Sequence, residues 1–123
     1  MPRTVRVFLL LEGVSFLLAA LVHAGALVGD YEDAGARIAE SVIGGVLLVG
    51  LALTWLAPAR TRAIGVVAQG FALAGTMVGT YLSVAGIGAS TVPDVVYHVA
   101  ILLTLVWGLT VAARRAGGEV DTA

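Results

Sequence analysis

Four long apolar runs, separated by short polar breaks, constrain the fold of this chain more than any other feature. The runs cover residues 5–28, 36–57, 63–87 and 93–113. Each is 20 to 25 residues long, and a helix of about 20 apolar residues crosses the hydrocarbon core of a bilayer. The runs do not alternate between apolar and polar residues, which argues against the strands of a membrane barrel. We therefore predict an all-α integral membrane protein, an up-down four-helix transmembrane bundle.

The overall composition supports this class and excludes others. Apolar residues make up 59% of the 123 residues and charged residues only 12%, whereas soluble domains are typically about half apolar and a quarter charged. With so little chain outside the spans, we expect one membrane domain over residues 1–115 and a disordered tail over 116–123. The absence of cysteine excludes disulfides and thiolate metal sites. No basic cluster is present, so nucleic acid is not an expected partner.

The positions of the basic residues predict the orientation in the membrane. All seven are arginines, and only Arg37 falls on the side of the membrane where the first two spans are connected, next to the acidic residues 30–33. Because cytoplasmic loops are enriched in arginine and lysine, we expect both termini in the cytoplasm, with the chain in a bacterial-type inner membrane. A cleaved signal peptide is the alternative for the first run, because the chain starts with a basic segment and has small residues at 24–26, near the end of the run. The length of the run and Glu12 within it favour a span. The arginines on the other side are Arg3, Arg6, Arg60, Arg62, Arg114 and Arg115.

Three ionisable side chains are expected at one depth inside the membrane. His23, Glu40 and His98 each lie about five residues from the same end of their predicted spans, roughly 7–8 Å deep at 1.5 Å per residue. Two imidazoles and a carboxylate are a ligand set of zinc and non-haem iron sites. We therefore predict a site for zinc, iron or haem b near the outer face, used for redox chemistry or metal handling, with both histidines as axial ligands in the haem case.

Four further residues are expected to support this site. Thr80, Asp94 and Tyr97 could orient the imidazoles by hydrogen bonding, and Arg37 could meet a haem propionate. Asp94 also follows Pro93 at the start of the fourth run, where the helix dipole favours a carboxylate.

A second polar layer lies closer to the cytoplasmic side. Glu12 and Gln69 stand on the polar faces of the first and third spans, and we expect them to form a proton-linked pair. Four spans in about 120 residues with one glutamate early in the first span resemble the small multidrug resistance transporters. That resemblance rests on Glu12 alone. It implies a homodimer in which this carboxylate exchanges protons for a cationic substrate.

Other functions stay open at this point. A pocket for a small hydrophobic ligand, such as a quinone or a lipid, would also use polar groups inside a bundle. Alternatively, Glu40 could accept hydrogen bonds from His23 and His98, while protonated Glu12 bonds Gln69, so that the polar residues only fix helix register. The chain would then be a scaffold or accessory subunit in the lipid bilayer.

Overall fold

The described part of the chain is built from helices joined by short connections and contains no strand. The computed structural model describes the backbone of residues 2–87 and 90–122 and the side chains of 3–87 and 90–114. Its helices are α1 (Pro2–His23), α2 (Ala34–Leu56), α3 (Thr61–Val84) and α4 (Val92–Thr122), with a short 3-10 helix, η1 (Pro58–Arg60), before α3. These findings confirm the predicted all-α fold. The bounds of α4 include most of 116–123, whose side chains lie outside the description, and the disordered tail there stays a prediction.

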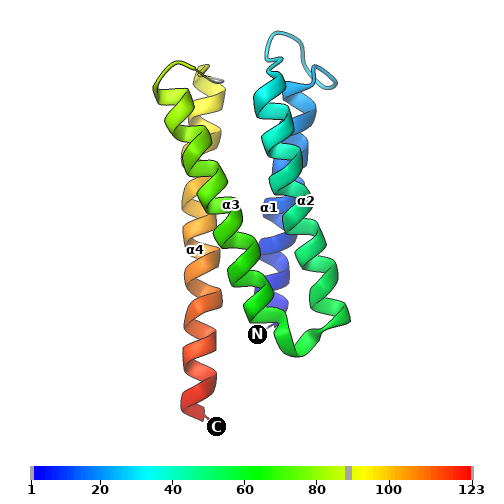
Figure 1. Cartoon of the computed structure of the whole chain (residues 1–123), viewed down its shortest axis with the longest axis vertical. Coiled ribbons are helices and arrows are strands. Elements are labelled where there is room, and N and C mark those ends of the chain that lie inside the picture. The colour runs from blue at the N-terminus through cyan, green and yellow to red at the C-terminus, as the bar shows by residue number, and fades with distance from the viewer. Residues whose placement is uncertain (1, 88–89, 123) are drawn as a thin grey trace.

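The helices form two antiparallel hairpins that lie side by side. In Figure 1, α1 and α2 form one hairpin and α3 and α4 the other. The connections 24–33 and 85–91 lie at one end of the bundle, which we call the loop end. The start of α1, the end of α4 and η1 lie at the opposite end, which we call the terminal end. The hairpins meet along two seams, one between α1 and α4 and one between α2 and α3.

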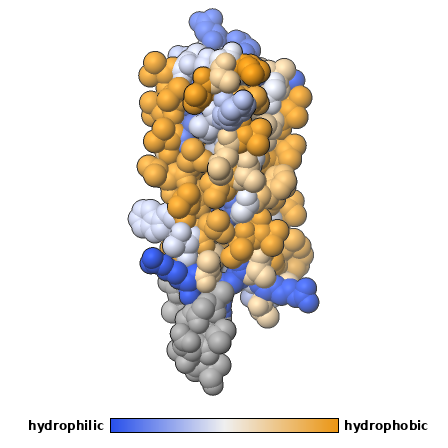
Figure 2. All heavy atoms as spheres, turned by 60° about the vertical axis from the view of Figure 1, so that its left-hand side comes forward, coloured by the Kyte–Doolittle hydropathy of each residue, from blue (hydrophilic) through white to orange (hydrophobic). Residues whose placement is uncertain are grey.

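The outer surface of the bundle is suited to lipid. Among the described residues, four helices are long and apolar enough to cross a membrane. Large apolar side chains such as Leu11, Val67 and Trp107 are more than half exposed. Figure 2 shows apolar residues covering the middle of the face in view, with hydrophilic residues gathered towards both ends. Because such a surface is unfavourable in water, the chain is best described as a multi-pass membrane protein.

The first helix ends earlier than the apolar run that encodes it. Gly25 has a φ of 75°, and its N–H donates to the carbonyl of Val22 at 3.0 Å. The Ala26 N–H donates to the carbonyl of Leu21 at 3.0 Å. This pair of bonds is the Schellman motif, which closes a helix through a residue in the left-handed region. α1 therefore stops at His23 rather than continuing to residue 28 as predicted.

The third helix ends in the same way. Gly86 has a φ of 75°, its N–H donates to the Ser83 carbonyl at 3.1 Å, and the Ile87 N–H donates to the Leu82 carbonyl at 2.9 Å. α3 thus ends at Val84 instead of reaching residue 87. At the start of α2, the Asp33 carboxylate accepts a hydrogen bond from the Ala36 N–H at 2.9 Å, as an N-cap residue does.

The core is narrow and mostly aliphatic, and a polar clamp closes it at the terminal end. Arg6 Nε donates to Thr54 Oγ1 at 2.9 Å and a terminal guanidinium nitrogen donates to the Thr54 carbonyl at 2.8 Å. The same guanidinium lies 5.0 Å from the centre of the Trp55 ring, within cation–π range. Arg6 therefore joins α1 to α2, a contact that the sequence did not predict. The buried apolar side chains include Val5, Leu9, Phe16, Leu47, Leu51, Ala68, Ala72, Ile101 and Leu105.

Candidate functional site

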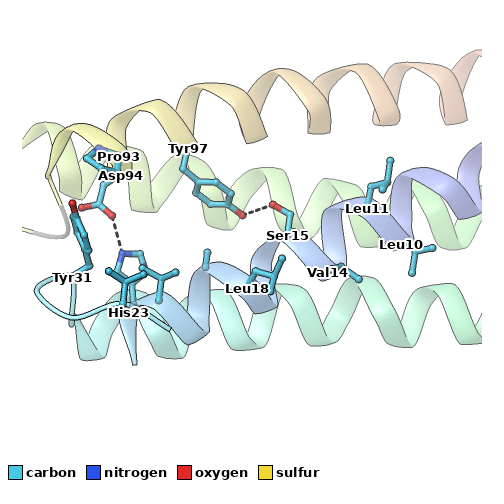
Figure 3. Close-up of a pocket in the computed structure, with 13 residues that line it drawn as sticks. Leu10, Leu11, Val14, Ser15, Leu18, His23, Tyr31, Pro93, Asp94 and Tyr97 are labelled. Carbon is cyan, nitrogen blue, oxygen red and sulfur yellow. Dashed lines mark hydrogen bonds and ion pairs between the residues drawn. The ribbon is translucent and has the colours of Figure 1, made fainter. Parts of the chain in front are cut away.

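At the loop end, three ionisable side chains from three helices form one cluster. His23 is the last residue of α1, Glu40 lies in the second turn of α2, and Asp94 lies in the first turn of α4. His23 Nδ1 is 2.5 Å from Glu40 Oε1, and His23 Nε2 is 2.8 Å from Asp94 Oδ1. Each of the three residues is less than 9% exposed. We call this cluster the outer triad; Figure 3 shows its His23–Asp94 half.

Asp94 is held in place by the start of its own helix. Its Oδ2 accepts hydrogen bonds from the Thr91 N–H at 3.0 Å and from Thr91 Oγ1 at 2.5 Å. The Asp94 N–H in turn approaches Thr91 Oγ1 at 3.4 Å. This reciprocal pairing is a capping box, with Thr91 at the N-cap position and Asp94 three residues later. The sequence Thr-Val-Pro-Asp at 91–94 carries that signal, and the sequence-based interpretation overlooked Thr91.

The chemistry of the outer triad follows from its hydrogen-bonding groups. Both ring nitrogens of His23 face carboxylate oxygens, and an ionised carboxylate can only accept. Either the imidazole carries two protons, or one of the carboxyl groups carries a proton. In both states His23 shares a proton with a carboxyl group, and its two hydrogen bonds link α1, α2 and α4. The triad can therefore hold a proton at the loop end and accept further hydrogen bonds through its carboxylate oxygens.

The predicted metal or haem site is not formed by these residues. Among the described residues, no group of three or more His, Cys, Asp or Glu side chains is arranged to hold a metal ion. The ring of His23 stands between the two carboxylates, so the oxygens do not converge on one point and neither ring nitrogen is free to bind a metal. His23, Glu40 and Asp94 therefore do not fit zinc, iron or haem iron in this arrangement.

His98 does not join His23 and Glu40, contrary to the prediction. Because α1 ends at His23, this residue pairs with Asp94, the third residue of α4, and His98 lies one turn further along. His98 Nδ1 donates to the Asp94 carbonyl at 2.7 Å, since a carbonyl only accepts. Its other nitrogen faces α3, where a Cβ built on Gly79 would lie 3.5 Å from Nε2. His98 and Glu40 do line one cavity of about 290 Å³ between α2 and the second hairpin.

The other expected supporting residues have separate roles. Tyr97 accepts a hydrogen bond from Ser15 Oγ at 3.1 Å and does not contact an imidazole through its hydroxyl. Thr80 Oγ1 donates to the Thr76 carbonyl of its own helix at 2.8 Å. Arg37 is exposed, and no ion pair joins it to the outer triad within the described residues. Of the four, only Asp94 directly contacts His23.

Glu12 and Gln69 are fully buried and make no hydrogen bond within the described part of the chain. Both are 0% exposed, and both carboxyl oxygens and both amide atoms lack a partner there. They are neighbours, since a Cβ added to Gly108 of α4 would collide with Gln69 Oε1 and lie 3.0 Å from Glu12 Oε2. The pair is therefore brought together as expected, but without the predicted hydrogen bond.

Two residues of the outer triad, His23 and Asp94, stand at one end of a groove between α1 and α4. The groove has a volume of about 700 Å³, within the range of small-molecule sites. Exposed side chains such as Leu11 and Leu18 form its wall, so it opens sideways towards lipid. Figure 3 shows His23, Asp94 and Tyr31 at its loop end and the Ser15–Tyr97 hydrogen bond further along. The remaining lining is apolar and includes Leu10, Val14, Ala19, Val22, Val28 and Pro93.

Comparisons with known proteins find no match to this chain. No family model matches the chain, and neither the curated proteins nor the solved structures contain a match. The functional argument therefore rests on the residues of this chain.

Proposed function

We propose that this protein binds a small amphipathic molecule from the bilayer, with its polar head at the outer triad and its apolar tail in the α1/α4 groove. The observation that carries this proposal is the shape and polarity of the groove, which is apolar apart from the Ser15–Tyr97 pair and ends at His23 and Asp94. From Leu10 to His23 the groove follows 14 residues of α1, which rise about 20 Å at 1.5 Å per residue. An alkyl tail of a dozen carbons fits that length.

Charge favours a cationic head with hydrogen-bond donors. Asp94 and Glu40 belong to the outer triad, and Glu32 and Asp33 lie in the connection that precedes α2, whereas Arg37 is the one arginine at this end of the described chain. The carboxylate oxygens of the outer triad have lone pairs for additional donors. We therefore take an alkylammonium as the ligand class, and we propose that the loop end faces the outside of a bacterial-type inner membrane, because the arginines gather at the terminal end.

A titration with dodecylammonium followed by native mass spectrometry tests the tail-binding groove. Val14→Trp places a large side chain in the groove, and we expect it to weaken binding about tenfold or more, which corresponds to 1.4 kcal/mol. Val7→Trp is the matched control, because Val7 is similarly exposed on the same helix but does not line the groove. Equal binding by both variants would exclude the α1/α4 groove as the tail site.

Glu12 supports a second candidate function, the proton-coupled transport of the same ligand class. A wholly buried carboxyl group without a hydrogen-bond partner in the described chain is costly at membrane depth, and a carrier uses such a group by alternately binding a proton and a cation. In vesicles, a dodecylammonium gradient should drive proton movement in the wild type and not in Glu12→Gln. Unchanged proton movement in Glu12→Gln would contradict transport through Glu12 and would leave ligand binding as the proposed function.

The metal and haem hypothesis and the scaffold hypothesis are less well supported. A metal site would require His23 to leave its two carboxylate partners and His98 to turn from its own helix. A scaffold would explain the buried hydrogen bonds, but it would give no role to a long groove that ends at charged groups.

A further inference from the structure

A second groove lies along the other seam between the hairpins. It has a volume of about 630 Å³ and is formed by α2 and α3, on helices that do not line the α1/α4 groove. Its walls are apolar, with Arg60 at one end and Ser41 at the other. The apolar lining includes Gly45, Val49, Leu53, Ile64, Val67 and Ala68.

The length of this groove matches one leaflet of a bilayer. From Ser41 to Leu53 the groove follows 13 residues of α2, which rise about 18 Å at 1.5 Å per residue. Half of a 30 Å hydrocarbon core is about 15 Å. The groove is therefore long enough for a single lipid tail of the leaflet at the terminal end, and too short to follow a tail across both leaflets.

Arg60 supplies a charge at the end where a lipid headgroup would lie. It closes η1, directly before α3, and its side chain is exposed. Within the described residues, this side chain has no hydrogen bond or ion pair. A guanidinium binds phosphate through a planar pair of donors. An apolar groove that ends at such a group is complementary to a molecule with an apolar tail and an anionic head.

We propose that the α2/α3 groove is a binding site for an anionic phospholipid, with one acyl chain between the helices and the headgroup phosphate on Arg60. This site is separate from the proposed ligand site at the outer triad. Basic positions between membrane helices recognise anionic headgroups in this manner. Gly45 provides room for the chain, since a Cβ added there meets nothing within 4 Å.

Native mass spectrometry of the full-length protein in detergent tests the site with two lipids that share the same acyl chains. We expect phosphatidylglycerol to bind about fivefold more tightly than phosphatidylcholine, as one headgroup–arginine contact near a surface implies. Arg60→Gln should remove most of this preference, because it should weaken phosphatidylglycerol binding more than binding of phosphatidylcholine, whose choline cation already offsets the phosphate charge. Arg114→Gln is the control, because Arg114 is exposed but does not line this groove, and it should keep the preference.

A matched pair of glycine variants tests where the acyl chain of the lipid binds. Gly45→Leu should fill the groove and weaken binding of both lipids about tenfold. Gly70→Leu is the control, because a Cβ at Gly70 also meets nothing within 4 Å. It should not weaken binding, since Gly70 does not line the groove. Equal affinities for the two lipids in the wild type would overturn the proposal. Competition by glycerol 3-phosphate, which has no acyl tail, would also overturn it. A change from dimer to monomer in Gly45→Leu, without a change in lipid binding, would overturn it too, because this face would then belong to an interface with a second copy.

Discussion

At the scale of single residues, His23 is the central group of the loop end. Its imidazole contacts both carboxylates of the outer triad, at 2.5 and 2.8 Å. Two acidic groups so near the hydrocarbon would otherwise face each other across the bundle, which is unfavourable without a proton or a cation between them. His23 thus determines whether Glu40 and Asp94 are compatible with the fold.

Replacing His23 should therefore lower the free energy of unfolding more than replacing His98. His23→Ala leaves Glu40 and Asp94 without their shared partner, and we expect the free energy of unfolding to fall by about 3 kcal/mol. His98→Ala removes one hydrogen bond to its own helix and should lower it by about 1 kcal/mol. Unfolding in mixed detergent micelles measures both values, and similar losses for the two variants would contradict this role for His23.

A triple variant separates the energetic contribution of the triad from its function. His23→Leu, Glu40→Leu and Asp94→Leu together remove the three ionisable groups of the outer triad, so stability should recover most of the loss seen in His23→Ala. About 1 kcal/mol should stay lost, because Asp94 also caps its helix with Thr91. Binding of dodecylammonium should not return, because the head would have no acceptor.

The polar residues show which features of a site can be predicted from one sequence. Depth along each run singled out His23, Glu40 and His98, and the structure brings the first two together. Asp94, expected only as a supporting residue, takes the place predicted for His98. Which of them touch could not be predicted, because the partner of His23 depends on where α1 ends. Because α1 ends five residues earlier than predicted, His23 pairs with Asp94 and not with His98. The metal hypothesis thereby loses the ligand set on which it was based.

At the scale of elements, the two hairpins begin with helices that end in the same way. Gly25 and Gly86 both have a φ of 75° and both close Schellman motifs. The left-handed region costs a residue with a Cβ roughly 1–2 kcal/mol, but not glycine. The apolar runs continue past both glycines, which is why hydrophobic pattern alone extended both helices too far.

Alanine substitutions test these helix ends. Gly86→Ala should lower the free energy of unfolding by about 1 kcal/mol for conformational reasons alone, since a Cβ there meets nothing within 4 Å. Gly25→Ala should cost more, because its Cβ would also lie 2.8 Å from Glu32 Oε1. Gly29→Ala is the control; it has open space and no positive φ, and a loss equal to that of Gly86→Ala would argue against the Schellman explanation.

At the scale of the whole molecule, the grooves follow from how the hairpins meet. Each hairpin is a closely associated pair, and the two seams between the pairs, α1/α4 and α2/α3, both leave apolar grooves. One groove ends at acidic groups at the loop end and the other at Arg60 at the terminal end. The number of spans was predictable from the length of the apolar runs, whereas the seams depend on side-chain packing between distant segments.

The measurement that tests the central claim most directly compares two molecules with the same tail and opposite heads. Dodecylammonium and dodecanoate are titrated against the wild-type chain and Asp94→Asn by native mass spectrometry. We expect one dodecylammonium per chain, bound about tenfold more tightly than dodecanoate, and we expect Asp94→Asn to lose most of that difference. Equal or reversed affinities in the wild type would contradict a cation-binding head site at the outer triad.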